Sequence, residues 1–252
     1  MNEQYYSPQR FSILPPVVKN LLIINGLFFL ATIAFRNILH IDLYDILGLH
    51  YIESELFYPH QFITYMFMHG GFGHIFFNMF ALWMFGSSIE NYWGAKKMLI
   101  YYFITGIGAA LVQELVCGIR IYDLVSQMHA DMVELVKENG LNIMSEGKNY
   151  SDQLMGELNL LINTPTVGAS GSVYGLLLAF GMIFPNALIY LYFFIPVKAK
   201  WFVIVYGAIE LFYGISGSND GVAHFAHLGG MIFGILLILL WKKKRRTNYP
   251  YY

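Results

Sequence analysis

Apolar stretches of about twenty residues recur along this chain, and they constrain its fold more than any other feature. A helix of roughly 20 apolar residues is long enough to cross a hydrocarbon core of ~30 Å. Hydrophobic residues make up 57% of the chain and charged residues only 12%. Soluble domains carry about 25% charged residues, so a conventional buried core is not expected. The composition predicts an integral membrane protein.

The apolar stretches predict an all-α, polytopic bundle of six transmembrane helices. Their predicted bounds are 18–35, 72–92, 98–117, 167–184, 201–216 and 222–241. We divide the chain into an N-terminal segment, 1–17, a membrane domain, 18–241, and a basic tail, 242–252. Segment 1–17 is polar and aromatic and does not have the pattern of a cleavable signal peptide.

The distribution of basic residues indicates an orientation. With six spans, eleven of the fifteen Lys and Arg residues fall on the side that holds both chain ends. Cytoplasmic loops carry an excess of Lys and Arg, so we expect both termini in the cytoplasm. The layout leads us to expect a bacterial cytoplasmic membrane. A net charge of −1 leaves no basic footprint for nucleic acid, and the lipid bilayer is the expected surrounding partner.

Two segments do not span. Residues 37–65 mix aromatic and charged residues, which predicts an amphipathic segment in the outer interface. Residues 118–165 form an extracytoplasmic polar insert with seven acidic and three basic residues. Within it, Leu124, Met128, Met132 and Leu135 follow helical spacing, so we expect one amphipathic helix over 121–138.

Polar residues inside spans are costly and are functional candidates. His74 and Asn78 are four residues apart, which places both on one face of a helix. Both can donate hydrogen bonds to one oxygen, as an oxyanion hole requires. A pair of interhelical hydrogen bonds that hold the bundle together explains the same spacing.

Ser170 and His227 are the candidate nucleophile and base. Ser170 lies between glycines at the start of the fourth span, where free backbone N–H groups stabilise negative charge. A packing role explains a lone Ser between glycines equally well. His227 lies inside the last span, and its neutral imidazole can accept a serine proton. No acid follows His227 in the same helix, so we expect a dyad rather than a triad.

Glycines on the same two spans supply the geometry. Gly171 and Gly175 are four residues apart, as are Gly230 and Gly234. Small residues at this interval let two helices approach closely. Close packing would bring Ser170 and His227 within the ~2.6–3.2 Å that proton transfer needs.

We expect neither a metal nor another cofactor. Cys117 is the single cysteine, which excludes an internal disulfide and a thiolate zinc cluster. No His-Glu-x-x-His motif occurs, which argues against a zinc protease. His224 and His227 could form a metal pair, but a structural or water-bonded His224 is the favoured interpretation.

Taken together, these motifs resemble the rhomboid family of intramembrane serine proteases. The resemblance runs over about 18–241 and is weakest in 118–165. It is carried by a set of motifs on separate spans: His74-x-x-x-Asn78, Gly86-Ser87-Ser88-Ile89-Glu90, Gly168-Ala169-Ser170-Gly171 with Tyr174, and Ala226-His227-x-x-Gly230-x-x-x-Gly234.

The resemblance implies a function for each motif. Ser170 would be the nucleophile and His227 the base, with the oxyanion held by His74, Asn78 and the Ser170 N–H. Tyr174 would pack on the His227 ring, and Glu90 would be a structural acid. The family fold implies six helices around a water-filled cavity, with a short fourth helix that starts at the nucleophile. The implied activity is endopeptidase cleavage of single-pass membrane proteins, at sites with small residues in weak helices.

The chain departs from the family pattern in two places. His60-Gln61 stand where many members carry a Trp-Arg pair, and a looser first loop would follow. The insert 118–165 is also longer than the pattern leads us to expect. A catalytically inactive rhomboid-like protein that binds membrane clients is the alternative, although it would be expected to lack Ser170 or His227. A channel or transporter explains the intramembrane polar residues but not the serine between glycines.

Overall fold

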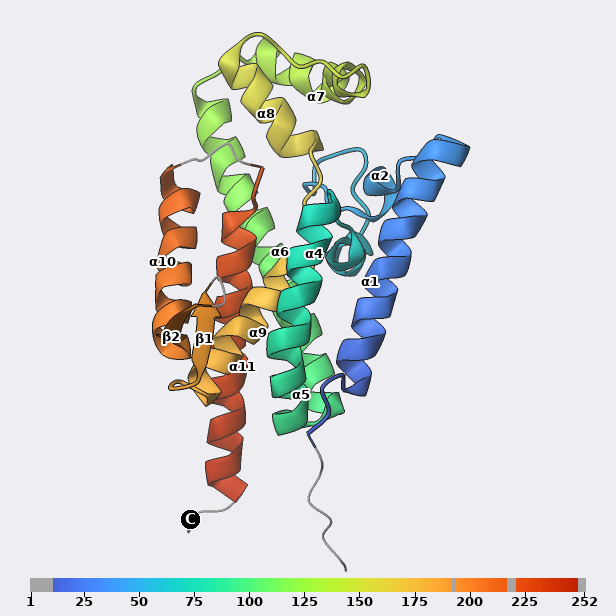
Figure 1. Ribbon diagram of the computed structural model, residues 1–252. Coiled ribbons are helices and arrows are strands. Elements are labelled where there is room, and N and C mark those ends of the chain that lie inside the picture. Colours follow the sequence, from blue (N-terminus) through green and yellow to red (C-terminus); the bar gives the residue numbers. More distant parts are fainter. Residues whose placement is uncertain (1–10, 192–193, 217–220, 249–252) are drawn as a thin grey trace, which may run out of the picture.

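The computed structural model describes residues 11–191, 194–216 and 221–248, and it is a bundle of membrane-length helices with a helical cap at one end (Figure 1). The α-helices are α1 (Pro16–Ala34), α2 (Leu43–Leu47), α3 (Gln61–Thr64), α4 (Phe72–Ala81), α5 (Ser87–Trp93), α6 (Ala95–Ser126), α7 (Ala130–Ser145), α8 (Gln153–Asn163), α9 (Ser170–Ile183), α10 (Ala199–Ser216) and α11 (His224–Asn248). Two π-helical segments, Phe35–Leu39 and Leu82–Gly86, continue α1 and join α4 to α5, and a 3₁₀ turn, Tyr65–Phe67, follows α3.

Among the described residues, five helical segments are long and apolar enough to cross a membrane: Pro16–Leu39, Phe72–Trp93, Ala95–Ser126, Ala199–Ser216 and His224–Lys243. The polytopic all-α fold is therefore confirmed, but the count of six full spans is not. The predicted fourth span is the 14-residue helix α9. At 1.5 Å per residue it is about 21 Å long, less than a hydrocarbon core of ~30 Å. The predicted residues 167–169 are not helical and lead into α9 as an irregular segment.

The bundle centre is made by α6, α9 and α11, which pack against one another. α1 and α4–α5 pack on one side of this centre, and α10 packs on α9 and α11 on another. Many apolar side chains on the outer helices stay exposed, as surfaces that face lipid would be. α1 begins and α11 ends at the same end of the bundle, opposite α7 and α8 (Figure 1).

Glu90 fixes the start of α1. This acid is 4% exposed, and its two carboxylate oxygens accept the backbone N–H groups of Val17 and Val18, each at 2.9 Å. The first N–H groups of a helix have no partner within the helix, and a carboxylate there also interacts favourably with the helix dipole. Glu90 thus has the structural position that the sequence motif implies.

The first loop is tied down rather than loose. Gln61 is fully buried, accepts the backbone N–H of His50 at 3.2 Å and donates to the carbonyl of Leu56 at 2.7 Å. His60 contacts the carbonyl oxygen of Ile46 at 2.8 Å. The expectation that His60-Gln61 would loosen this loop is therefore wrong, because these side chains bond to the backbone carbonyls of the loop itself.

The loop also holds the segment that leads into α9. Leu49 and Thr166 form an isolated antiparallel bridge, with N–H···O distances of 2.9 and 2.7 Å. The N–H of Gly168 donates to the carbonyl of Tyr65 at 2.9 Å. Irregular backbone beside a membrane needs such partners, since lipid offers none.

The insert 118–165 differs from the single amphipathic helix expected over 121–138. α6 continues to Ser126, and α7 starts at Ala130. The helix is interrupted between them at Gln127–His129. The turn lets α7 and α8 fold back on the end of α6. Six buried residues form an apolar cluster there: Ile121, Leu124, Val136, Met155, Leu158 and Ile162. Leu135, expected on the apolar face, is 47% exposed because that cluster uses a different face.

Two further features depart from the predicted organisation. An antiparallel hairpin, β1 (Leu188–Leu191) and β2 (Ile195–Lys198), connects α9 to α10 within an otherwise helical fold. The first residues of the expected tail, 242–248, continue α11, and 249–252 lie outside the described residues. Residues 1–10 of the N-terminal segment also lie outside them.

Candidate active site

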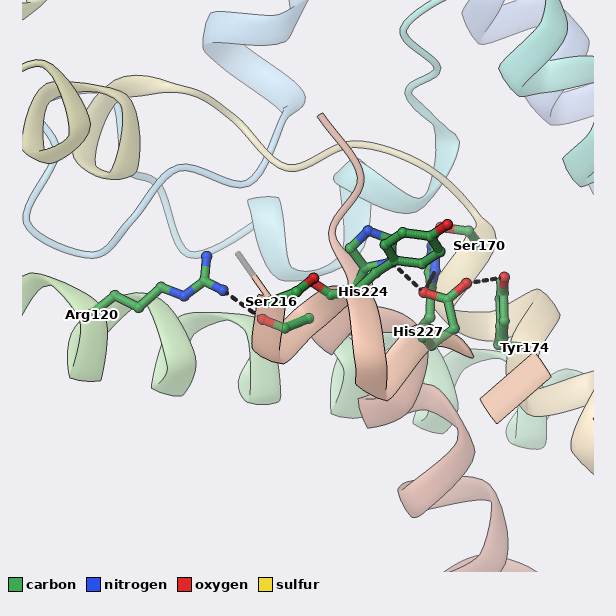
Figure 2. A network of polar contacts seen from close by, with 9 residues as sticks. Arg120, Ser170, Tyr174, Ser216, His224 and His227 are labelled. Atoms are coloured by element: carbon green, nitrogen blue, oxygen red, sulfur yellow. Dashed lines mark hydrogen bonds and ion pairs between the residues drawn. The ribbon is translucent and has the colours of Figure 1, made fainter. Parts of the chain in front are cut away.

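Ser170 and His227 meet at the centre of the bundle, as the sequence predicts. Ser170 is the first residue of α9, and His227 lies in the first turn of α11. The Oγ of Ser170 is 2.8 Å from Nε2 of His227, a hydrogen-bond distance (Figure 2). This is within the ~2.6–3.2 Å that a general base needs to take a proton from a nucleophile.

Glycines account for this short distance. A Cβ placed on Gly230 would lie 1.9 Å from the carbonyl oxygen of Gly171, so α9 and α11 touch through their backbones. Gly175 and Gly234 instead make room for side chains of α6: a Cβ on Gly175 would lie 2.8 Å from Thr105, and one on Gly234 would lie 2.3 Å from the hydroxyl oxygen of Tyr101. The Tyr101 hydroxyl donates to the Gly175 carbonyl at 2.9 Å. Gly171 and Gly230 therefore lie at the contact between α9 and α11, whereas Gly175 and Gly234 lie against α6. The backbone contact between Gly171 and Gly230 is the closest of these approaches between the helices of Ser170 and His227.

Tyr174 lies one turn after Ser170 and stacks on the imidazole of His227. The ring centroids are 4.2 Å apart and the rings are inclined by 6°. The packing that the sequence resemblance implies is therefore present. The Tyr174 hydroxyl donates to the carboxylate of Glu210 on α10.

His74 points its Nε2 toward the nucleophile. Its Nδ1 accepts the backbone N–H of Gly70 at 3.3 Å, which leaves the ring proton of the neutral imidazole on Nε2. A Cβ on Gly168 would lie 2.7 Å from this Nε2 and 3.5 Å from the Ser170 Oγ. Gly168 has φ 128°, a conformation that favours glycine, so the chain turns here without a side chain in the space between His74 and Ser170.

Asn78 is buried one turn further along α4. Its Nδ2 donates to the His74 carbonyl at 2.9 Å, a bond within its own helix. An amide has two N–H donors, so one remains for another acceptor. The bond to its own helix gives no support to the alternative that Asn78 holds two helices together.

Backbone donors complete the surroundings of Ser170. Because α9 begins at Ser170, the N–H groups of its first turn have no acceptor within the helix. They lie beside the Oγ with the positive end of the helix dipole. A carbonyl oxygen bound here would meet these N–H groups and the Nε2–H of His74.

Glu210 is the site residue that the sequence analysis missed. It is 5% exposed, and its Oε2 is 3.0 Å from Nδ1 of His227 and 2.6 Å from Nδ1 of His224. The expectation of a dyad rested on the helix of His227 alone, whereas this acid comes from α10. The detectable signal was a lone acid in an apolar span, which is costly unless it has partners.

His224 therefore has a structural partner in Glu210, in keeping with the favoured interpretation. Glu210, His224 and His227 could also hold a metal ion, because one ligand atom from each lies within 4.8 Å of the others. Around a tetrahedral zinc ion, donor atoms ~2.0–2.1 Å from the metal lie roughly 3.3 Å apart. The two Glu210–His contacts of 2.6 and 3.0 Å are shorter, as hydrogen-bonded or ion-paired groups are.

Comparison with known proteins places these residues in a family context. A sequence model described as "Rhomboid domain" matches residues 57–120 and 139–244. The chain is 28% identical over 193 residues to the mitochondrial RHOMBOID-like protein 12 of Arabidopsis thaliana, covering 76% of this chain and 48% of the relative. It is 26% identical over 242 residues to the chloroplastic Rhomboid-like protein 11 of the same plant, covering 87% and 66%.

A fungal protein is similar to the same extent. The mitochondrial Rhomboid protein 1 of Saccharomyces cerevisiae is 25% identical over 193 residues, covering 77% of this chain and 44% of the relative. The matched region thus spans between 44% and 66% of the length of these three relatives.

Proposed function

This chain belongs to the rhomboid family, and from that premise we propose that it is an intramembrane serine endopeptidase that cleaves membrane-spanning segments of single-pass proteins. The observation that carries the proposal is the 2.8 Å contact between Ser170 Oγ and His227 Nε2 at the start of a helix. A packing serine has no need of an imidazole at this distance.

In the proposed reaction, His227 Nε2 takes the hydroxyl proton as Ser170 Oγ attacks the scissile carbonyl carbon. A C–O bond forms, and the carbonyl π electrons move to the oxygen. The resulting oxyanion is stabilised by the Ser170 N–H, the His74 Nε2–H and the free N–H of Asn78.

Collapse of this intermediate re-forms the carbonyl and breaks the C–N bond, and His227 gives its proton to the leaving amine. An ester on Ser170 remains. Water then attacks the ester carbon while His227 takes the water proton. His227 returns that proton to Ser170 Oγ as the second product leaves with a carboxylate.

The substrate class follows from the place of the site. Ser170 lies at the end of a helix too short to span, inside the bundle rather than on an exterior domain. A peptide bond in an intact helix has its carbonyl oxygen hydrogen-bonded, so attack needs an unwound segment. We propose membrane segments with small residues and weak helical propensity as substrates.

We propose that the site opens toward the end of the bundle that carries α7 and α8, which lies opposite the start of α1 and the end of α11 (Figure 1). Basic residues are in excess at the opposite end, and such an excess is typical of the cytoplasmic side. The proposed opening would therefore face the non-cytoplasmic side. The expected bacterial cytoplasmic membrane gains no support, because the names of the three relatives assign them to mitochondria and a chloroplast.

The test is cleavage of a single-pass substrate in liposomes. Ser170→Ala and His227→Ala are each expected to abolish cleavage, and a metal chelator is expected to have no effect. A fluorophosphonate probe should label wild-type protein at Ser170 and leave His227→Ala unlabelled.

Ser172→Ala is the matched control. Ser172 is buried two residues away, and its hydroxyl donates to the Tyr102 carbonyl at 2.7 Å. Its loss should cost about 1 kcal/mol of stability and leave turnover intact. Retained cleavage in Ser170→Ala would rule out the serine-protease proposal. A wild-type protein that binds such segments but neither cleaves them nor reacts with the probe would indicate the inactive, client-binding alternative.

A further inference from the structure

Glu210 lies behind the imidazole of His227, on the side away from Ser170. We propose that Glu210 is a positioning residue that orients His227 and selects its basic tautomer, so that the site works as a serine–histidine–glutamate set drawn from three helices. This inference rests on the proposed protease function and adds to it a carboxylate that a simple dyad lacks.

The two ring nitrogens of His227 face two different groups. Nε2 is 2.8 Å from the Ser170 hydroxyl, and Nδ1 is 3.0 Å from the Oε2 of Glu210. Within the described residues, Nδ1 has no hydrogen bond of good direction, so its 3.0 Å approach to Oε2 is a close contact that is not yet aligned as a hydrogen bond. A small rotation of the carboxylate or the ring would align it.

This arrangement selects a tautomer. Neutral imidazole carries one proton, and a proton on Nδ1 faces the carboxylate of Glu210. The other tautomer would set a nitrogen lone pair against a carboxylate oxygen, which is repulsive. With the proton on Nδ1, the Nε2 lone pair points at the Ser170 hydroxyl, as a general base requires.

The carboxylate also faces the charge that develops during the reaction. When His227 takes the proton of Ser170, it becomes an imidazolium 3.0 Å from Glu210. Both residues are buried, at 7% and 5% exposure, so water screens this attraction weakly. A fixed charge placed before the reaction costs no reorganisation when the imidazolium forms.

Glu210 is itself held in place from two helices. Tyr174 of α9 donates its hydroxyl to Oε1, and His224 of α11 lies with Nδ1 2.6 Å from Oε2 (Figure 2). Tyr174 stacks on the His227 ring at the same time, so one side chain contacts both the base and its carboxylate. The hydrogen bonds with Tyr174 and His224, together with the nearby His227 ring, provide partners for a buried charge that would otherwise be too costly to keep.

A purely structural role for Glu210 would be to tie α10 to the bundle. Glu90 is the internal comparison, because it is equally buried and bonds only to the start of α1 among the contacts described above. Substitution of each acid therefore distinguishes a structural role from the proposed positioning role. Loss of Glu90 should lower stability alone, whereas loss of Glu210 should lower the rate of the chemical step.

The experiment compares Glu210→Gln, Glu210→Asp and Glu90→Gln in the full-length protein reconstituted in liposomes. Each is measured for kcat and KM on a single-pass substrate, for the rate of fluorophosphonate labelling and for the thermal unfolding midpoint in detergent. Glu210→Gln should lose about 10²-fold or more in kcat with KM within about 3-fold, and labelling should slow in parallel. Glu210→Asp keeps the charge but sets it further from His227, so it should recover about tenfold of that loss and stay about tenfold below wild-type kcat.

Two further variants sharpen the assignment. Glu90→Gln should unfold at a lower temperature with kcat unchanged. His224→Gln should lower kcat less than Glu210→Gln does, because His224 reaches the base through the carboxylate. A larger loss in His224→Gln would mean that Glu210 serves His224, which overturns the proposal.

The outcomes are distinct from those for the protease itself. Wild-type kcat in Glu210→Gln, with Ser170→Ala inactive, overturns the positioning role and leaves the protease proposal intact. A change confined to KM or to the unfolding midpoint has the same meaning. Cleavage by Ser170→Ala would overturn the protease proposal whatever Glu210 does. If Glu210→Gln does not fold, Glu210→Asp decides, since unchanged kcat there contradicts the role. Inhibition by a chelator would show a metal site instead.

Discussion

The contact between Gly230 and Gly171 makes a sharp prediction for Gly230→Ala. The added methyl carbon would lie 1.9 Å from the Gly171 carbonyl oxygen and 2.7 Å from its carbonyl carbon, whereas real Cβ contacts are not shorter than 3.0 Å. The obstacle is backbone, which cannot rotate away as a side chain can. α9 and α11 must therefore separate by roughly 1 Å, and Ser170 must move away from His227 by a similar amount.

Two magnitudes follow from this separation. Overpacking of a close contact costs about 1–3 kcal/mol of stability. A misplacement of about 1 Å between reacting groups costs roughly 10²-fold in rate, equivalent to about 2.7 kcal/mol in the activation barrier. We expect Gly230→Ala to fold, with a lower unfolding midpoint, and to lose about 10²-fold in kcat.

The assay is cleavage of a reconstituted single-pass substrate at saturating concentration, normalised to folded protein. Gly26→Ala is the matched control, because a Cβ on Gly26 of α1 meets nothing within 4 Å. It should keep wild-type kcat and gain slightly in helix stability. Wild-type kcat in a folded Gly230→Ala protein would refute the argument that this glycine contact sets the Ser170–His227 distance.

Three other predictions test neighbouring features. Asn78→Ala removes a proposed oxyanion donor and should lower kcat by about 10²-fold. Its loss of stability should stay under about 1 kcal/mol, because the described bond of Asn78 lies within its own helix. A large loss of stability together with the loss of kcat would favour a packing role. Glu90→Gln removes the charged cap of α1 and should cost about 1–2 kcal/mol in thermal unfolding with kcat unchanged; an unchanged midpoint would contradict it. Burial, reinforced by the neighbouring His74, lowers the pKa of His69 to about 4, so the unfolded chain binds more protons below pH ~6.5. The resulting stability is fully present above pH ~6.5 and is lost as pH falls toward 4, by about 3 kcal/mol; His69→Phe should flatten that part of the stability–pH curve, measured by unfolding in detergent.

The sequence was sufficient for the parts of the site that lie in short motifs. Ser170, His74 and His227 each stand out as a polar residue in an apolar stretch. The spacing of glycines predicts the contact between the helices of Ser170 and His227. The length of the fourth helix does not follow from the sequence, because the apolar stretch 167–184 includes irregular, non-helical residues before Ser170. Hydropathy does not distinguish apolar residues in a helix from apolar residues in another backbone conformation.

The missed features depend on contacts between distant segments. Glu210 reaches His227 from another helix, and nothing in the sequence around His227 predicts that approach. Helical spacing continued through Gln127–His129, so the break between α6 and α7 was invisible to periodicity. It becomes understandable only from the cluster that α7 and α8 bury against α6.

We expect that cluster to open and close as a cooperative unit of its own. The apolar side chains of α7, α8 and the last turns of α6 pack mainly on one another and form a core separate from that of the bundle. Local opening of such a unit costs only the free energy of its own contacts. Amide hydrogens in α7 and α8 should therefore exchange with solvent sooner than those at the centre of α6, α9 and α11. The cap can melt and reform while Ser170 and His227 stay in register.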